Sequence, residues 1–451
     1  MKRFEQLDQV LDDIMVRWDI PGLGVGIVEE GHIVYATGFG VQSLATGVPV
    51  TPESIFCVAS IAKCFVACAI MQLVEQDILR LDGHLVDYLP DFQLDDGHYH
   101  EITLRQILSH TSGMPDMDEV EYDQLVIHPA YDEEASARYV HALSKRKMIA
   151  LPGERFAYSN IAYNVLGHLI TQRTNQTFED YMKAYILNPA GMADSTFFFP
   201  DVPIDRLAVP HLRTPQMIPN PIHPYHRADA PASFLYTSVI EMCRWAITSL
   251  NRGFYNGLRI LSPCSYDLMW TPVVKRNYPP FREEMGLGWA LGHFEGARTV
   301  AHGGGGFGWT CHLILTPEKN RAAIILCNEE SSAIECFEKA VVRSLLELEP
   351  NPGTISWMVP LARALQAGGI QAAYVCFEDI KHKPGYFFDP YDLITLVYQL
   401  LSVKKYDMAI DVLKLNLQAF PGHGETSTLL ESIGTCKDGS LWKLFYTQSI
   451  G

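Results

Sequence analysis

The sequence lacks several features that would restrict its class at once. Its 451 residues contain no uninterrupted run of about 18 apolar residues, which leaves no candidate transmembrane helix. It has no block of consecutive basic residues, and its formal net charge is −17, so neither nucleic acid nor an anionic membrane surface is expected as the main partner. Residues 1–18 alternate polar and apolar side chains and lack the apolar core of a signal peptide, which predicts a cytoplasmic protein.

Cysteine pairs and metal-ligand clusters are also scarce. The ten cysteines include no C-x-x-C pair and stand mostly in apolar segments, so we expect buried free thiols rather than disulfides or metal ligands. The only H-x-H motif, at residues 98–100, falls in a polar segment that is typical of an exposed loop. The sequence therefore predicts no metal site.

Apolar residues are abundant, at 48% of the chain, which is enough for a sizeable core. Strand patterns near both ends enclose a mostly helical middle. This arrangement predicts an α/β domain from residues 1–55 and 285–350, an inserted helical domain over 56–284, and a cleft between the two. The individual elements that we expect are helices over 4–18, 60–76 and 332–348, a hairpin over 22–41, and strands over 286–294, 297–302, 309–316 and 322–328.

Residues 351–451 follow a different pattern and form a C-terminal helical extension. The stretch 389–422 looks like a helical hairpin of the tetratricopeptide type, although no repeat of about 34 residues recurs. Three interpretations stay open: the extension packs onto the rest of the protein, it contacts a partner protein, or it has no separate role.

Ser60 and Lys63 form an S-x-x-K motif at the start of the apolar segment 58–76. Residues i and i+3 share one face of a helix, so the side chains can meet, and a partly neutral lysine can take the serine proton. Three further S-x-x-K matches, Ser144/Lys147, Ser402/Lys405 and Ser440/Lys443, stand in charged or tail segments. Only Lys63 stands where a buried cation would be costly without a purpose. The alternative is a lysine that reaches solvent or pairs with a carboxylate.

A second motif, Tyr158-x-Asn160, is the only Y-x-N in the chain. A tyrosine near cations can act as a general base, and an asparagine amide can orient the lysine and hold a substrate carbonyl. The alternative is that Tyr158 covers a core and Asn160 caps the helix that follows.

The third motif is the glycine run in "AHGGGGFGW", residues 301–309. Consecutive glycines allow close backbone approach, and their N–H groups can stabilise an oxyanion. No Gly-Lys-Ser/Thr follows, which excludes a phosphate loop, and the chain has no G-x-S-x-G elbow of an α/β-hydrolase. The alternative is a flexible hairpin.

Ser60-x-x-Lys63, Tyr158-x-Asn160 and His302-Gly303-Gly304 stand in the order found in the serine β-lactamase and penicillin-binding-protein superfamily, and the chain resembles that superfamily. It is most similar to the branch with class C β-lactamases, D-Ala-D-Ala carboxypeptidases, D-aminopeptidases and β-lactamase-like esterases. The likeness includes "IPGLGVGIVEEGHIVYATGFG", "TPESIFCVASIAKCF", "ITLRQILSHTSGMPD", "LPGERFAYSNIAYNVLG" and "HGGGGFGW", within roughly residues 10–345. It implies a β-lactamase-like transpeptidase fold, with an antiparallel sheet flanked by helices.

The resemblance also implies roles for the first two motifs. Ser60 would be the acylated nucleophile, and Lys63 would activate it. Tyr158 would be the base for acylation and the proton donor to the leaving group. Asn160 would bind Lys63 and the acyl amide of the substrate.

In the third motif the resemblance implies that the backbone N–H groups of Ser60 and Gly305 form the oxyanion hole. His302, Gly303 and Gly304 would line the substrate site, and Phe307 and Trp309 are possible cleft walls. Many relatives carry lysine where His302 stands. A histidine titrates near neutral pH and offers a weaker, switchable charge, which favours esters, amides or D-amino-acid peptides over efficient β-lactam hydrolysis.

The expected function is therefore that of a serine hydrolase that needs no metal or organic cofactor and acts on a small molecule or short peptide. The alternatives are a penicillin-binding D-Ala-D-Ala carboxypeptidase or endopeptidase, and an acyltransferase that uses the same residues. A different class is a non-catalytic binding or scaffold protein on a hydrolase fold. The intact set of Ser60, Lys63, Tyr158 and Asn160 argues against that last reading, because such buried polar groups are costly to keep.

Overall fold

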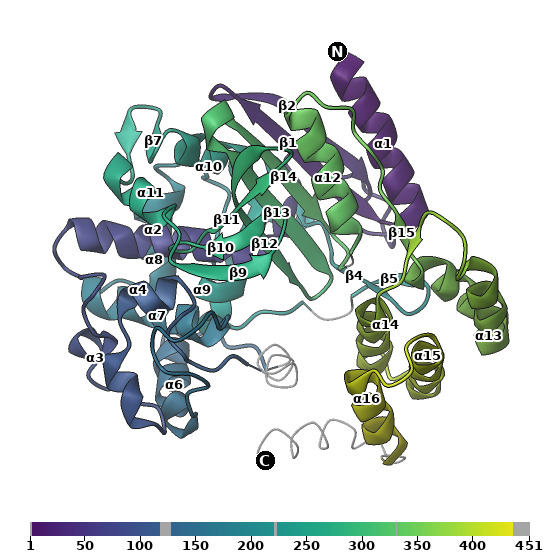
Figure 1. Cartoon of the computed structure of the whole chain (residues 1–451). Coiled ribbons are helices and arrows are strands. Elements are labelled where there is room, and N and C mark those ends of the chain that lie inside the picture. Colours follow the sequence, from purple (N-terminus) through teal and green to yellow (C-terminus); the bar gives the residue numbers. More distant parts are fainter. Residues whose placement is uncertain (1, 118–127, 221–222, 331, 436–451) are drawn as a thin grey trace.

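An eight-stranded antiparallel sheet forms the centre of the protein (Figure 1). The computed structural model describes residues 2–117, 128–220, 223–330 and 332–435. Two N-terminal strands lie beside six later ones in the order β2-β1-β14-β13-β12-β11-β10-β9. Their bounds are β1 Gly22–Glu29, β2 His32–Gly40, β9 Val274–Tyr278, β10 Arg282–Met285, β11 Ala290–Phe294, β12 Ala297–Gly306, β13 Trp309–Thr316 and β14 Arg321–Cys327. Because β1 pairs with β14, segments far apart in the chain share one sheet.

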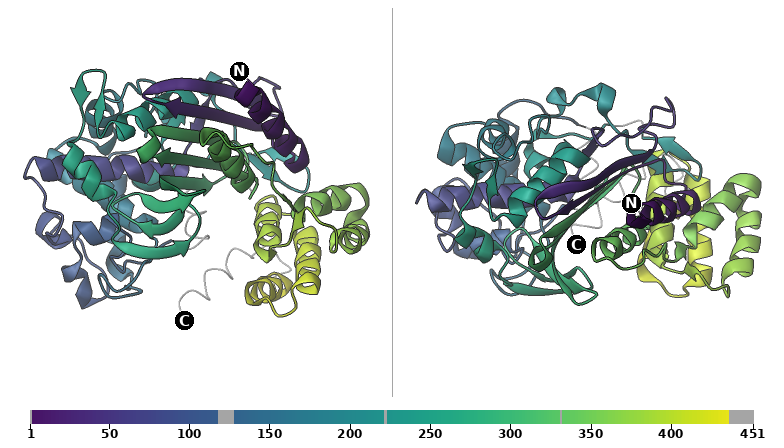
Figure 2. Two further views of the ribbon diagram at one scale, coloured as in Figure 1. Left: turned by 45° about the horizontal axis from the view of Figure 1, so that its top comes forward. Right: turned by 90° about the horizontal axis from the view of Figure 1, so that it is seen from above.

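The sequence of β1 explains why helices cover both faces of the sheet. Its alternating apolar residues are buried on the face that carries α1 (Lys2–Trp18) and α12 (Ala333–Leu345), which lie side by side in Figure 2. Gly24 and Gly26 face α10 (Val239–Leu250), and a Cβ on Gly26 would lie 2.5 Å from the Sγ of Cys243. The absence of side chains on this face lets α10 pack directly against the strand.

The segment between β2 and β9 forms the helical half of the molecule, drawn at the left of Figure 1. Its central helix, α2 (Ala62–Glu75), is buried along residues 62–73, as expected for a helix that is apolar on every side. The other helices are α3 Leu85–Tyr88, α4 Leu104–Leu108, α6 Ala135–Ala142, α7 Asn160–Thr174, α8 Phe178–Met182, α9 Ala230–Ser233 and α11 Pro263–Met269. Short strand pairs complete it: β3 Ile55–Cys57 with β6 Tyr236–Ser238, β4 His211–Arg213 with β5 Met217–Pro219, and β7 Phe254–Tyr255 with β8 Leu258–Arg259.

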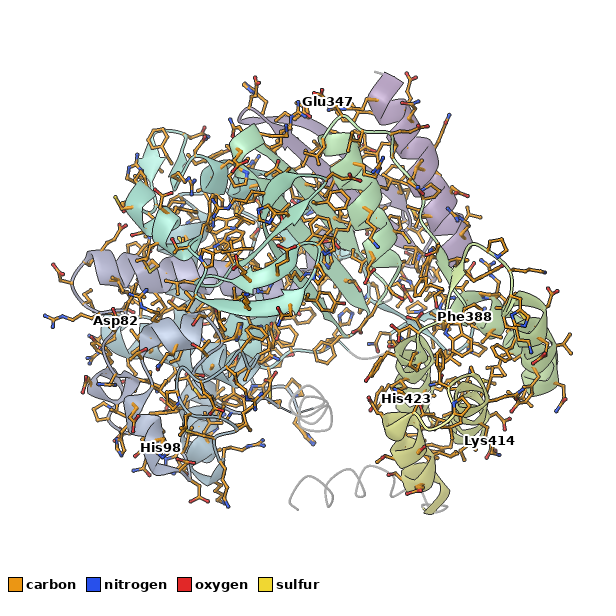
Figure 3. The ribbon with its side chains drawn as sticks, viewed as in Figure 1. Asp82, His98, Glu347, Phe388, Lys414 and His423 are labelled. Carbon is orange, nitrogen blue, oxygen red and sulfur yellow. The ribbon has the colours of Figure 1, made fainter. Side chains whose placement is uncertain are left out.

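The C-terminal extension packs against the body beside α1. Its elements are β15 Ile355–Ser356, α13 Met358–Ile380, β16 Tyr386–Phe387, α14 Pro390–Ser402, α15 Tyr406–Ala419 and α16 Gly424–Thr435. Phe388, labelled in Figure 3, is partly buried and lies 5.4 Å from Trp357 between ring centroids, against a core that the extension shares with α1 and α12. Arg363 donates a 2.9 Å hydrogen bond to Asp19 at the end of α1, and Asp392 accepts one of 2.6 Å from Ser332. These contacts tie the extension to the rest of the protein.

Most predicted elements are present, including the antiparallel sheet, the closing helix and the helical hairpin α14–α15. Two predictions are wrong in detail. Strands β9 and β10 lie in the range for which the sequence predicts a helical domain. They escape prediction because their mostly polar residues show no apolar alternation. Cys264 is exposed rather than buried, although all nine cysteines in the described residues are free. Among those residues, no helix is long and apolar enough to cross a membrane. The domain boundaries stay a prediction.

Candidate active site

Lys63 is fully buried at the start of α2, and its Nζ atom makes three hydrogen bonds. It donates to Ser60 Oγ at 3.0 Å, to Asn160 Oδ1 at 2.7 Å and to the carbonyl oxygen of Ala232 at 2.8 Å. In the described part of the chain Lys63 forms no ion pair, and all three acceptors are neutral. The alternative of a lysine that reaches solvent or pairs directly with a carboxylate is therefore wrong.

Ser60 lies in the short 3-10 helix Ala59–Ile61 that leads into α2. The residue before it, Ala59, has φ of +45°, a left-handed conformation that is uncommon for a residue with a side chain. Ala59 is also buried, so its surroundings hold it in this strained geometry. Strained backbone of this kind concentrates at functional sites, where it fixes the direction of a reactive side chain.

Asn160 is held between Lys63 and a carboxylate that sequence analysis did not assign. Asp116 Oδ1 accepts a 2.8 Å hydrogen bond from the backbone N–H of Asn160, and Asp116 Oδ2 accepts one of 3.2 Å from its side-chain amide. These bonds turn the amide oxygen of Asn160 toward Lys63. Ser159, not Asn160, caps helix α7, since its hydroxyl accepts from the N–H of Ala162. Asp116 belongs to the segment "ITLRQILSHTSGMPD", and the likeness of this segment to the family was the only sign in the sequence that Asp116 lies at the site.

Tyr158 contacts both Lys63 and a histidine that sequence analysis missed. The Nζ atom of Lys63 stands 5.0 Å from the centre of the Tyr158 ring. His110 stacks on Tyr158 with 4.3 Å between ring centroids, and its Nδ1 accepts a hydrogen bond from Ser159 N–H. Burial, followed by the charge of Lys63, lowers the pKa of His110 well below its usual value. His110 is therefore a neutral ring that supports Tyr158.

The glycine run belongs to β12 and passes directly beside Ser60. A Cβ on Gly304 would lie 2.2 Å from the carbonyl oxygen of Val58 and 2.9 Å from the N atom of Ser60. The same atom on Gly305 would meet nothing closer than 3.9 Å. On the opposite face, a Cβ on Gly303 would lie 2.8 Å from His312. Only glycine at position 304 lets the strand backbone reach the nucleophile segment.

His302 faces this site but does not carry the predicted switchable charge. Its Nδ1 donates a 2.6 Å hydrogen bond to the carbonyl oxygen of Gly303, so the lone pair of the neutral ring is on Nε2. Burial, followed by the charge of Lys63, lowers the pKa of His302 to about 3. The expectation of titration near neutral pH is therefore corrected: desolvation keeps the ring neutral.

The two aromatic residues after the glycine run differ in position. Phe307 is half-buried and stacks on Phe234 with 5.9 Å between ring centroids. Trp309 is only 1% exposed and donates a hydrogen bond from its indole nitrogen to Ala208. The prediction that Trp309 walls the cleft is therefore wrong, because its side chain belongs to the core.

A further buried carboxylate, Asp229, lies in the polar region around Lys63. Its Oδ1 accepts a 2.7 Å hydrogen bond from Asn164, and burial raises its pKa to about 7 although Asn164 and Lys63 both lower it. Asp229 comes from the Pro-rich segment 213–234, where no motif marked it. Only the folded chain brings this carboxyl group close enough to Lys63 for the two to interact electrostatically.

The polar segment around His98 forms a short 3-10 helix, Gly97–Glu101, on the outer surface of the helical half (Figure 3). His98 pairs with Glu101 across 3.2 Å, and both side chains are exposed. Among the residues that the structure describes, no group of three or more His, Cys, Asp or Glu side chains could hold a metal ion.

Comparison with known proteins gives the family. The family model for Beta-lactamase matches residues 7–346. Penicillin-binding protein 4 of Amycolatopsis lactamdurans is 26% identical over 324 residues, which are 70% of this chain and 83% of that protein. The octameric penicillin-binding protein homologue from Pyrococcus abyssi has 27% identity and a TM-score of 0.67, with 80% of each chain covered.

A third similarity concerns the fold alone. The D-amino acid amidase from Ochrobactrum anthropi SV3 has 20% identity and a TM-score of 0.64, with 77% of this chain and 98% of that chain covered. The motifs meet at one site, and the family model covers most of the sequence. The chain therefore belongs to the Beta-lactamase family of serine hydrolases.

Proposed function

We propose that this protein hydrolyses small esters, amides or D-amino-acid peptides through an acyl-enzyme on Ser60. The observation that carries the proposal is the fully buried Lys63, whose Nζ lies 3.0 Å from Ser60 Oγ and 2.7 Å from Asn160. At that distance Lys63 is placed to exchange a proton with Ser60 Oγ as the hydroxyl attacks.

In the proposed reaction, Ser60 Oγ forms a bond to the acyl carbon while its proton passes to Lys63 or Tyr158. The bond to the leaving group then breaks, and that group receives the proton. Water next attacks the acyl carbon, which releases the acid and restores Ser60. The N–H groups of Ser60 and Gly305 would stabilise the negative oxygen in both steps, and such donors contribute about 10²–10³-fold in rate.

The second candidate is a penicillin-binding peptidase that acts on D-Ala-D-Ala peptides. The similarity to penicillin-binding protein 4 of Amycolatopsis lactamdurans, over 70% of this chain, favours it. His302 is neutral, so the third motif itself offers no cation to a substrate carboxylate.

The test is intact-protein mass spectrometry of wild type and Ser60→Ala after mixing with a penicillin or a p-nitrophenyl ester. Release of p-nitrophenol is followed in parallel. Ester turnover in the wild type alone, without a lasting penicillin adduct, is the expected result. A lasting adduct together with cleavage of a D-Ala-D-Ala peptide would favour the second candidate. Equal turnover in Ser60→Ala would contradict both.

A further inference from the structure

Arg276 on the edge strand β9 is a half-buried cation that has no counter-ion among the residues described by the structure. Its guanidinium lies 5.4 Å from the centre of the Phe156 ring. It forms no hydrogen bond or ion pair with any residue that the structure describes. The neighbouring arginine, Arg282, does have polar partners, since it lies 3.3 Å from Glu338 and 3.0 Å from His312. Arg276, unlike Arg282, has no carboxylate partner among the described residues.

A short series of ring contacts joins Arg276 to the candidate active site. Phe156, under the guanidinium, lies 5.9 Å from His110 between ring centroids, and His110 stacks on Tyr158 at 4.3 Å. Arg276 is also near enough to act on the site electrostatically. Burial and Lys63 are the larger causes that lower the pKa of His302, and Arg276 adds to them. The guanidinium is thus linked to Tyr158 through the rings of Phe156 and His110.

An unpaired guanidinium that is partly removed from water loses hydration without a compensating partner, which is unfavourable unless a ligand supplies the partner. Its planar array of donors matches a carboxylate in a bidentate geometry. Nearby Lys63 has all its hydrogen bonds satisfied inside the protein, and His302 is neutral. Arg276 is therefore the cation best placed to receive an anionic group of a substrate.

We propose that Arg276 is a specificity-determining residue that binds a carboxylate of the substrate whose acyl group is transferred to Ser60. This inference rests on the proposed function and narrows it to substrates that carry a negative charge. In this proposal the positive charge that binds the carboxylate is on strand β9, not in the third motif on β12.

The test uses matched ester pairs that differ in one carboxylate. On the acyl side the pair is p-nitrophenyl glutarate and p-nitrophenyl valerate, and on the leaving-group side it is 3-acetoxybenzoate and phenyl acetate. Steady-state kinetics are measured for wild type, Arg276→Gln and Arg276→Lys. The matched control is Lys275→Gln, which removes an exposed charge from the adjacent position of the same strand.

We expect Arg276→Gln to raise KM for one of the two anionic esters roughly 10- to 100-fold, as for loss of a charged hydrogen bond. Its neutral counterpart should be unaffected, Arg276→Lys should recover part of the loss, and Lys275→Gln should behave like wild type. Equal losses for charged and neutral esters would show a structural role and overturn the proposal. So would an effect of Lys275→Gln equal to that of Arg276→Gln.

Calorimetric titration of Ser60→Ala with the same esters separates this inference from the proposed function. If the wild type turns over no ester but Ser60→Ala binds the anionic ester only when Arg276 is present, the proposed function fails and the carboxylate site stands. If the neutral esters are hydrolysed and neither anionic ester depends on Arg276 in binding or in KM, the hydrolase stands and the carboxylate site is refuted.

Discussion

The Nζ atom of Lys63 lies 2.7 Å from Oδ1 of Asn160, a residue 97 positions away in the chain. Asn160 is in turn fixed by two hydrogen bonds to Asp116. The segment that carries Ser60 and Lys63 is thus joined to helix α7 through one polar contact, and the proposed acylation of Ser60 would depend on how accurately this contact is maintained.

Replacement of Lys63 should abolish turnover because Ser60 loses the group that can take its proton. We expect Lys63→Ala to lower kcat for a p-nitrophenyl ester by at least about 10³-fold. The matched control is Lys147→Ala in another S-x-x-K segment, where Lys147 is exposed. Equal activity in the two variants would mean that Lys63 has only a structural role.

Asp116 should act by positioning Asn160 rather than by touching substrate. We expect Asp116→Ala to lower kcat by about 10- to 100-fold, because Asn160 loses both fixed hydrogen bonds. Asp116→Asn keeps one acceptor oxygen and should lose less. Steady-state kinetics with circular dichroism spectra separates this effect from unfolding. A loss confined to KM would be inconsistent with positioning of the lysine.

The glycine run offers a test with its own internal control. Gly304→Ala should displace the nucleophile segment, since the new Cβ would lie 2.2 Å from the Val58 carbonyl oxygen. We expect it to reduce the free energy of unfolding by about 1–3 kcal/mol and to impair acylation by a small ester. Gly305→Ala has free space and should keep the wild-type melting temperature. Similar melting temperatures for both variants would argue against this packing.

His302 should not titrate near neutral pH, because its pKa is lowered to about 3 by burial and then by Lys63. The pH dependence of kcat/KM for a neutral ester should therefore have the same shape in wild type and His302→Gln between about pH 5.5 and 7.5. The unfolded chain binds this proton more readily than the folded one. Wild-type stability should thus fall relative to His302→Gln as pH drops from about 6.5 toward 3. A kinetic step near pH 6.5 in the wild type alone would contradict this assignment.

Asp392 should make attachment of the C-terminal helices sensitive to pH. Burial raises its pKa to about 6, although hydrogen bonds from Ser332 and Ser356 lower it. The protonated acid is favoured in the folded state, so its contribution is present below the usual pKa of 3.8 and is lost as pH rises through about 6.

The neutral variant Asp392→Asn should lack this dependence. Its unfolding free energy relative to wild type should improve by roughly 2–3 kcal/mol between about pH 4 and pH 7. Thermal unfolding followed by circular dichroism at several pH values measures this difference. Parallel stability curves for the two proteins would refute the prediction.

Much of the candidate site could be predicted because its motifs are local. Ser60 and Lys63 share a helix face, Tyr158 and Asn160 are two residues apart, and the glycine run is contiguous. Strands β9 and β10 were missed because a polar edge strand leaves no hydrophobic period. Trp309 was misplaced because an aromatic residue beside a glycine run can equally face a cleft or the core.

By itself, the sequence determined the nucleophile motif, the order of the three motifs and the sheet-forming segments, because these depend on spacing and on hydrophobic pattern. Only the tertiary structure decided which charges the site holds. Asp116 and Asp229 become neighbours of Lys63 through segments far apart in the chain, and Arg276 reaches Phe156 from the edge strand of the sheet. The neutral state of His302 was also decided there, since a pKa follows from burial and nearby charge, and both arise only when the chain has folded.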